Sequence, residues 1–214
     1  MYVFIFIFYL VVTGCSKGIG LCYAHELAKK GMNLVLIARK VELLNKIAEE
    51  IRAKYGVQVE VLIADFGHGA TIYKDIEEGL ANKDIGILVN NVGVAYGIKR
   101  FHKESEENIL NMINVNIGAM TLMTKMILPK MEAKKKGAII NVSSMYAFAP
   151  QQYAKGVTMY SATKAYVDFF SRGLSYECSD KGITVQSVCP GKVTFHGVTY
   201  SCTDYKAFPT DQGS

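Results

Sequence analysis

The sequence predicts an α/β protein: a doubly wound parallel sheet of about six strands with helices on both faces, which makes three layers α/β/α. Two observations lead to this prediction. Six apolar, β-rich runs alternate with segments of helical periodicity, and each run is hydrophobic almost without interruption. Strands covered on both faces have that composition. Strands that alternate with helices are joined by right-handed crossovers, so the sheet is expected to be parallel.

The predicted elements follow one another without a linker, an internal repeat or a low-complexity tract. The runs that we expect to be strands are FYLVVTG (8–14), NLVLIAR (33–39), VQVEVLIAD (57–65), IGILVNN (85–91), GAIINVSS (137–144) and ITVQSVCP (183–190). The expected helices are 18–31, which closes with Gly31 in the usual C-terminal position, 40–54, 70–81, 105–133 and 158–178. We therefore predict one domain over residues 1–191. Residues 192–214 are polar without periodicity, which predicts an irregular C-terminal tail.

The composition fits one globular domain in a reducing compartment. The chain has 214 residues, of which 50% are hydrophobic and 20% charged, enough for a substantial core. Five scattered cysteines without a C-x-x-C pair argue against a disulfide framework and against a zinc site, so no metal is predicted. The net charge is +5, and the basic run Lys134–Lys136 precedes Gly137, where a helix end attracts cations. No aromatic residues interleave with this run, which favours a solvated helix end over a nucleic-acid patch.

The chain opens with the apolar run MYVFIFIFYLVV, residues 1–12. A helix that spans a bilayer needs about 20 apolar residues, and a cleavable signal would have a basic region before the run. The run continues directly into the first predicted strand and its turn, so we favour a buried strand preceded by extra apolar residues. The alternative is the end of a membrane-anchoring segment, which would associate the protein with a membrane.

A glycine-rich turn lies between the first strand and the first helix. The segment VVTGCSKGIG has glycines at positions 14, 18 and 20, a T-G-x-x-x-G-x-G spacing. Glycines let the backbone turn tightly and approach a pyrophosphate that lies over the helix N-terminus. Such a turn is weak evidence by itself, but its position between a strand and a helix indicates a dinucleotide site.

The residues after the second strand indicate which dinucleotide binds. An acidic residue there would hold the free ribose hydroxyl of NAD, but this chain has Arg39 and Lys40, with Lys17 in the glycine turn. Cations match the 2'-phosphate of NADP(H), which we therefore expect as the cofactor. The alternative is that Arg39 is only a surface charge at a strand end.

These features and several further motifs resemble the short-chain dehydrogenase/reductase family between Thr13 and Gly191. The motifs are TGCSKGIG (13–20), AD ending at Asp65, NNVG (90–93), NVN ending at Asn116, NVSS (141–144), YSATK (160–164) and PG (190–191). Each is short, but their combination in this order is specific. NNVGVAY, ILPKM, GAIINVSS and YSATKAYVDFFSRGL are most similar to the branch that holds 17-beta-hydroxysteroid dehydrogenases and very-long-chain 3-oxoacyl-CoA reductases. The resemblance implies a Rossmann-like fold.

The resemblance also implies which residues hold NADP(H). They come from the glycine turn, from the ends of the strands, from the helix of Tyr160 and from the segment after the sixth strand. They are Thr13, Gly14, Ser16, Lys17, Gly18, Ile19, Gly20, Arg39, Asp65, Asn91, Val92, Gly93, Tyr160, Lys164, Pro190, Gly191 and Val193. Asp65 is expected at the adenine edge.

Tyr160 and Lys164 are the candidates for the chemistry. Tyr160 lies at the start of the predicted helix 158–178, and Lys164 four residues on shares its helix face, so both side chains can point into one cleft. No other tyrosine between residues 141 and 164 has a lysine four residues on. Free tyrosine has a pKa of about 10, and a neighbouring ammonium favours the phenolate and lowers this pKa.

By resemblance, Tyr160 donates a proton to the substrate carbonyl as hydride arrives, and Lys164 holds the nicotinamide ribose. Ser144 would hydrogen-bond the same carbonyl oxygen, and Asn116 in the long helix would hold a water that relays the proton. Ser143 competes with Ser144 because alternation along a strand sends the two to opposite sides, and the SS pattern of the family favours Ser144. The alternative for these polar residues is a structural role, satisfied by the backbone.

Three departures from the family pattern concern the substrate side. Ser144 and Tyr160 are 16 residues apart, three more than is common in the family, and the excess falls in the loop segment QQYAKGV (151–157). Loops absorb insertions at little cost. Thr194 directly follows Val193, where the family usually has a threonine slightly later, so Thr194 is the candidate substitute. Members of this branch continue through substrate-covering helices and a seventh strand, which we expect to be missing here, with the sixth strand an open edge.

The sequence therefore predicts an NADPH-dependent oxidoreductase that reduces a ketone, or oxidises the matching secondary alcohol, on a lipid-like substrate such as a steroid or a 3-oxoacyl-CoA. The alternatives are a catalytically silent or truncated NADP(H)-binding protein and a membrane-associated scaffold that uses residues 1–12. By resemblance we expect the endoplasmic reticulum as the location, or the cytoplasm if there is no membrane anchor. The resemblance also implies a homodimer through the helix of Tyr160 and the long helix before it.

Overall fold

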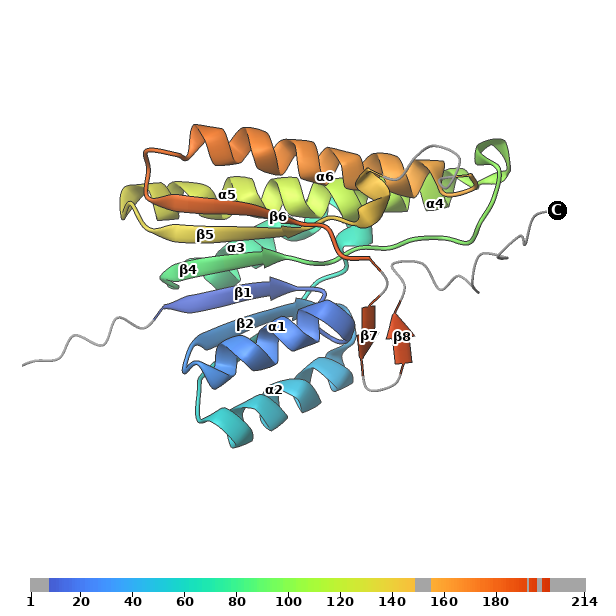
Figure 1. Ribbon diagram of the computed structural model, residues 1–214. Helices are drawn as coiled ribbons and strands as arrows, with labels where there is room; N and C mark the ends of the chain where they lie inside the picture. The colour runs from blue at the N-terminus through green and yellow to red at the C-terminus, as the bar shows by residue number, and fades with distance from the viewer. Residues whose placement is uncertain (1–7, 149–154, 192, 196–197, 201–214) are drawn as a thin grey trace, which may run out of the picture.

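The described part of the chain forms three layers, with a sheet between two layers of helices (Figure 1). The computed structural model describes residues 8–148, 155–191, 193–195 and 198–200, with side chains up to Gly191. Six parallel strands form the central sheet in the order β3–β2–β1–β4–β5–β6. The strands are β1 (Tyr9–Thr13), β2 (Asn33–Ala38), β3 (Val59–Ile63), β4 (Ile85–Asn90), β5 (Gly137–Val142) and β6 (Ile183–Val188). The predicted doubly wound sheet is confirmed.

Strand order reverses between β1 and β4, and this reversal positions the site. β1 pairs with β2 on one side, from Tyr9 with Asn33 to Thr13 with Ile37, and with β4 on the other. The connections from β1 and from β4 therefore leave the sheet in opposite directions, which opens a crevice beyond the carboxyl ends of the strands. The glycine turn after β1 lies at this switch point.

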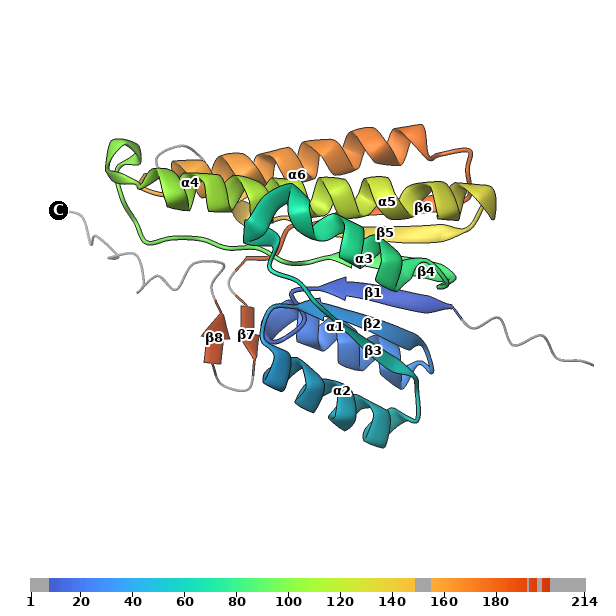
Figure 2. The same cartoon turned by 180° about the vertical axis from the view of Figure 1, so that it is seen from behind.

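Alternate side chains of the strands enter two separate cores. Val11, Val35 and Leu88 pack with residues of α3, α5 and α6 on one face, and Leu10 and Leu34 pack with residues of α1 and α2 on the other. The helices are α1 (Gly18–Lys29), α2 (Val41–Tyr55), α3 (Tyr73–Leu80), α5 (Ala119–Ala133) and α6 (Thr158–Glu177). Figures 1 and 2 show the two layers from opposite sides. Full burial of each aliphatic side chain contributes about 1.5–3 kcal/mol, so uninterrupted apolar strands are stable only between two such layers.

The long helical stretch predicted over 105–133 contains an irregularity. It consists of α4 (Glu106–Met112), the π-helical segment η3 (Ile113–Gly118) and α5. A π-turn inserts one extra residue into a helix and is frequent at functional sites. Here the π segment carries Asn116, which the sequence assigned to the catalytic set.

Two predicted segments differ from the structure. Helix 70–81 is preceded by the 3-10 segment η1 (Phe66–Ile72), so α3 starts at Tyr73. The tail after Pro190, predicted to be irregular, contains the antiparallel pair β7 (Val193–Phe195) and β8 (Val198–Tyr200). Each has only three residues, β-branched or aromatic, and three residues are too few to show the alternation that identifies a strand in a sequence.

The opening apolar run is a strand where it is described. β1 starts at Tyr9, as favoured from the sequence, and residues 1–7 of the run lie outside the described residues. Within the described ranges, no helix has both the length and the apolar composition to cross a bilayer. β6 is an edge of the six-stranded sheet, and Thr184 and Gln186 on it are exposed.

Candidate active site

A cleft of about 480 Å³ lies beyond the carboxyl ends of the strands, at the switch point. Most of the residues predicted to hold a dinucleotide line it. They are Gly14, Ser16, Lys17, Gly18, Ile19, Arg39, Asp65, Asn91, Val92, Gly93, Tyr160 and Lys164. The cleft thus joins the glycine turn, the ends of β2, β3 and β4, and the start of α6, which are far apart in the sequence.

Gly20 and Asn91 hold the glycine turn against β4. Asn91 Nδ2 donates to the carbonyls of Thr13 and Gly14, at 3.0 Å each. A Cβ at Gly20 would lie 2.4 Å from that Nδ2 and 2.7 Å from the Gly14 carbonyl oxygen, so only glycine fits. Gly20 itself is not part of the cleft wall. It lets α1 approach closely enough for the turn to face the cleft.

Thr13 also supports the wall from behind. Its Oγ1 accepts hydrogen bonds from the backbone amides of Asn91 and Val92, at 3.0 and 3.1 Å. The neighbouring Cys15 is fully buried, and this burial raises the pKa of its thiol to about 12. The thiol is therefore neutral at physiological pH, and Cys15 serves as packing rather than as a nucleophile.

Arg39 and Asp65 form the charged end of the cleft. Arg39 Nη1 lies 3.8 Å from Asp65 Oδ2, and the Arg39 side chain is 63% exposed. The other carboxylate oxygen of Asp65 accepts from the Gly67 amide at 2.9 Å, which fixes the aspartate at the start of η1. An exposed pair of this kind contributes little stability, so the guanidinium is available to a phosphate.

Tyr160 and Lys164 are brought together as predicted. Both lie on α6, are about 95% buried and line the cleft. Lys164 Nζ donates to the Val142 carbonyl at 2.9 Å and lies 5.8 Å from the centroid of the Tyr160 ring. Tyr146 packs edge-on against that ring, with centroids 6.0 Å apart. The ammonium is thus held where it favours the ionised phenol.

The two serines at the end of β5 have different partners. Ser143 lines the cleft, but its hydroxyl donates to the Lys164 carbonyl at 2.7 Å. Ser144 is fully buried, precedes the short segment η4 (Met145–Ala147), and accepts from the Tyr146 amide at 3.3 Å. Among the described residues, the Ser144 hydroxyl has no acceptor for its own proton, whereas that of Ser143 has one. Ser144 therefore keeps a proton that it can donate, but Ser143 and not Ser144 is among the residues that line the cleft, which is the reverse of the side expected from the sequence. The catalytic role of Ser144 stays a prediction.

Asn116 is fully engaged by its neighbours. Its Oδ1 accepts from the Val94 amide at 2.8 Å, and its Nδ2 donates to the Val94 carbonyl at 2.9 Å and to Thr163 Oγ1 at 3.0 Å. These bonds tie the π segment to the loop after β4 and to α6. The side-chain amide therefore positions two walls of the site. Both Nδ2 protons are used, whereas Oδ1 accepts the one hydrogen bond from Val94 and can accept a second, so the predicted water-holding role stays a prediction.

Pro190 and Gly191 are not part of the cleft wall. The Pro190 carbonyl accepts from the Met145 amide at 2.9 Å, so the end of β6 is tied to η4 beside Ser144. Val193 and Thr194 belong to β7, and their side chains lie outside the described set, as does the segment 149–154 with most of the predicted insertion. The cofactor roles predicted for these residues stay predictions.

The sequence missed several lining residues. The cleft wall also includes Ala38, Ala64, Phe66, Val94, Ala95, Tyr96, Asn111, Val115, Val142 and Ser143. Asn111 Nδ2 donates to the Tyr96 hydroxyl, which joins α4 to the loop after β4. The only sequence signal for Asn111 is its place one and a half turns before Asn116 on the same helix, which is too weak to single it out.

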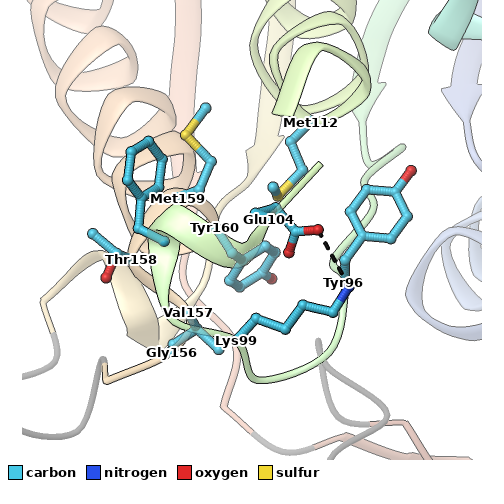
Figure 3. Close-up of a pocket in the computed structure, with 10 residues that line it drawn as sticks. Tyr96, Lys99, Glu104, Met112, Gly156, Val157, Thr158, Met159 and Tyr160 are labelled. Carbon is cyan, nitrogen blue, oxygen red and sulfur yellow. Dashed lines mark ion pairs between the residues drawn. The ribbon is translucent and has the colours of Figure 1, made fainter. Parts of the chain in front are cut away.

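A second, small pocket of about 20 Å³ also has Tyr160 in its wall (Figure 3). Its walls come from the loop after β4, from α4 and from the start of α6, and they include Lys99, Glu104 and Met112. Tyr160 lines both the cleft and this pocket. A phenol in that position can exchange a proton with a group that contacts both spaces.

These features fit a dinucleotide. The backbone turn at Gly14 and Gly20 and the cations Lys17 and Arg39 at the cleft match the pyrophosphate and phosphate groups of such a cofactor. In the described part of the chain, no group of three or more histidine, cysteine or acidic side chains is arranged to hold a metal ion.

Comparisons with known proteins agree with this geometry. The profile of the short chain dehydrogenase family matches residues 9–202. The chain is 46% identical over 183 residues to the very-long-chain 3-oxoacyl-CoA reductase of Anas platyrhynchos, and 46% identical over 181 residues to the inactive hydroxysteroid dehydrogenase-like protein 1 of Homo sapiens. These matches cover 84% of this chain but only 58% and 54% of the relatives, so the chain spans little more than half of their length.

A solved structure agrees as well. A short-chain dehydrogenase from Sphingobium yanoikuyae in complex with NADPH superposes with a TM-score of 0.81 at 37% identity, over 87% of this chain and 72% of that chain. The relative therefore shares the fold of this chain. The protein described here belongs to the short-chain dehydrogenase family.

Proposed function

We propose that the protein is an NADP(H)-dependent oxidoreductase that reduces a ketone to a secondary alcohol. The observation that carries the proposal is the position of Tyr160 between the dinucleotide-sized cleft and the small pocket, with Lys164 Nζ held beside it. Bound NADPH supplies a hydride to the carbonyl carbon. Tyr160 supplies the proton to the carbonyl oxygen, and the Lys164 ammonium stabilises the phenolate that remains.

Preference for NADP(H) over NAD(H) is supported by the charged end of the cleft. Arg39 follows β2, where the ribose 2'-position of a dinucleotide lies in this fold, and Asp65, at 3.8 Å, is the one ion-pair partner of its guanidinium among the described residues. Guanidinium groups bind phosphate through paired hydrogen bonds. The solved relative in complex with NADPH also supports the proposal.

We further propose a lipid-like substrate, a steroid or a 3-oxoacyl-CoA, on the basis of the relative named as a very-long-chain 3-oxoacyl-CoA reductase. The proposed location is the endoplasmic reticulum.

A homodimer through α5 and α6 is supported by aromatic side chains on the outer face of α6: Phe169 is 75% exposed and Tyr176 is 84% exposed. In a dimer these rings would leave solvent.

The test is oxidation of NADPH in the presence of steroid ketones and 3-oxoacyl thioesters, measured as the loss of the nicotinamide absorbance. The wild-type protein should turn over at least one of them, and Tyr160→Phe should reduce kcat by about 10²–10⁴-fold because the proton donor is lost. NADPH affinity, measured by fluorescence, should be unchanged. An unaltered kcat in Tyr160→Phe would remove the tyrosine from the mechanism.

A second candidate function is NADP(H) binding without turnover. The name of the human relative, which describes it as inactive, favours this candidate, whereas the presence here of Asn116, Ser144, Tyr160 and Lys164 favours catalysis. Tight NADPH binding with no oxidation by any ketone in the panel would establish the second candidate in place of the first.

A further inference from the structure

The small pocket beside Tyr160 has one charged wall. Glu104, just before α4, contributes a carboxylate whose side chain is only 8% exposed. The surrounding walls include Met112 and Val157, which are apolar. In Figure 3 the carboxylate lies beside the Tyr160 ring, with Lys99 linked to it. A pocket of about 20 Å³ holds one water-sized group, so any group placed in it contacts several of these walls at once.

The hydrogen bonds of Glu104 are unevenly divided between its two oxygens. Oε1 accepts from Asn108 Nδ2 at 2.7 Å and from the Ser105 amide at 3.2 Å, and Lys99 Nζ lies 3.5 Å from it. No hydrogen bond from the described residues reaches Oε2. The Asn108 hydrogen bond is the main cause that lowers the pKa of Glu104, so the carboxylate is ionised at neutral pH.

The position of Glu104 relative to Tyr160 is fixed by a contact between two loops. The Lys99 amide donates to the Gly156 carbonyl at 3.0 Å. Gly156 has a φ of +82°, and a Cβ there would lie 2.3 Å from Ile98 Cγ2, so glycine is needed for this approach. Gly156 is four residues before Tyr160 on the chain. The loop that carries Lys99 and Glu104 is thus held against the start of α6 before any substrate binds, which is the preorganisation that a recognition site requires.

We propose that Glu104 Oε2 accepts a hydrogen bond from the substrate, so that the protein prefers ketones that carry a neutral donor, a hydroxyl or an amide N–H, close to the reacting carbonyl. This inference rests on the proposed function and narrows its substrate class. An anionic group in the same pocket would meet the ionised carboxylate, which disfavours it. A purely apolar group would take the place of water at Oε2 without replacing its hydrogen bond.

Two matched pairs of ketones test the inference and identify the source of the donor. The first pair is a hydroxysteroid ketone and its deoxy analogue. The second is an N-alkyl 3-oxoacyl amide, which has an amide N–H three bonds from the reacting carbon, and the corresponding S-alkyl thioester, which has none. A hydrogen bond to a charged group should raise kcat/KM for the donor-bearing member of at least one pair by about ten-fold. The pair that shows the preference identifies hydroxyl or amide as the donor.

Glu104→Gln tests the residue itself. The glutamine carbonyl can take the place of Oε1 toward Asn108, which turns the amide NH₂ toward the pocket, so the preference should fall to about one or reverse. Glu104→Asp, which withdraws the carboxylate by one methylene, should lower it in part. The control is Glu107→Gln, which removes the same charge from an exposed position on α4 and should leave the preference unchanged. Thermal unfolding and NADPH affinity show that each variant is folded.

Different outcomes separate this inference from the proposed function. If no ketone is reduced while NADPH binds, the proposed function fails and the substrate preference fails with it. If wild type reduces both members of both pairs equally, or if Glu104→Gln retains the wild-type preference, the oxidoreductase function stands and the role of Glu104 is wrong.

Discussion

At the scale of single residues, the surroundings of Tyr160 combine one contact within α6 with hydrogen bonds between distant parts of the chain. Tyr160 and Lys164 share a helix face by their spacing alone, and the structure places Nζ beside the ring. The role of Asn116 could not be read in the same way, because its amide bonds run to Val94 and Thr163, 22 and 47 residues away in the sequence. Only the folded chain shows which groups the Asn116 amide contacts.

Ser143 and Ser144 are the residue-scale choice on which we make a prediction. In the proposed mechanism, Ser144→Ala should reduce kcat by about 10²–10³-fold because a donor to the carbonyl oxygen is lost. NADPH affinity should hold, and the free energy of unfolding should fall by about 1 kcal/mol because the Tyr146 amide loses its acceptor. Ser143→Ala should instead lower the free energy of unfolding by about 0.5–1.5 kcal/mol, because it removes the buried hydrogen bond from the Ser143 hydroxyl to the Lys164 carbonyl. Steady-state kinetics and denaturant unfolding of both variants separate the two roles. A large kcat loss confined to Ser143→Ala would reverse the assignment.

At the scale of elements, the helices and strands were predictable wherever a long apolar pattern has one period. The π segment was not, because Ile113–Gly118 continues the apolar pattern of the helix on both sides. The hairpin of β7 and β8 was missed because its strands are too short to show a period. The predicted end of the first helix is confirmed: α1 ends at Lys29, and Gly31 after it has a φ of 79° and donates its amide to the Ala28 carbonyl.

The contact between α1 and β4 gives the element-scale prediction. Gly20→Ala should lower the free energy of unfolding by roughly 1–3 kcal/mol, because the new Cβ overlaps Asn91 Nδ2 and the Gly14 carbonyl. Asn91 cannot move away without losing its bonds to Thr13 and Gly14. NADPH affinity should fall with stability, since the glycine turn is displaced. Thermal unfolding and a fluorescence titration measure the two effects.

The matched control is Gly173→Ala. Gly173 is an exposed position in α6 with nothing within 4 Å of its added Cβ. Alanine in an exposed helix is favoured over glycine by about 0.5–1 kcal/mol, so this variant should be slightly more stable than wild type. Equal stability of the Gly20→Ala and Gly173→Ala variants would contradict the close approach of α1 to β4.

At the scale of the whole molecule, the cofactor half was predictable and the substrate half was not. The order of six strands follows from alternation and handedness, and the cleft follows from the strand order. The proposed substrate side depends on the loops 95–104 and 155–157, which are joined by the hydrogen bond from the Lys99 amide to the Gly156 carbonyl. Neither loop has a periodic pattern, so the sequence does not indicate that they lie together or that Glu104 lies near Tyr160.

Cofactor binding should therefore stabilise the molecule as a whole, and it provides the last prediction. The cleft joins β1, β2 and β4 to α6, so a dinucleotide that fills it binds only the folded chain. At 100 times its Kd, such a ligand adds about 2.7 kcal/mol to the free energy of unfolding. For a domain of this size this corresponds to a rise in Tm of roughly 5–10 °C.

NADH at the same concentration should give a smaller rise in Tm than NADPH, because NADH has no 2'-phosphate for Arg39 to bind. Arg39→Gln should bring the NADPH shift down to that of NADH, while the NADH shift stays as in wild type. Equal shifts with the two cofactors in the wild-type protein would refute the assigned preference, and no shift with either would refute the dinucleotide site.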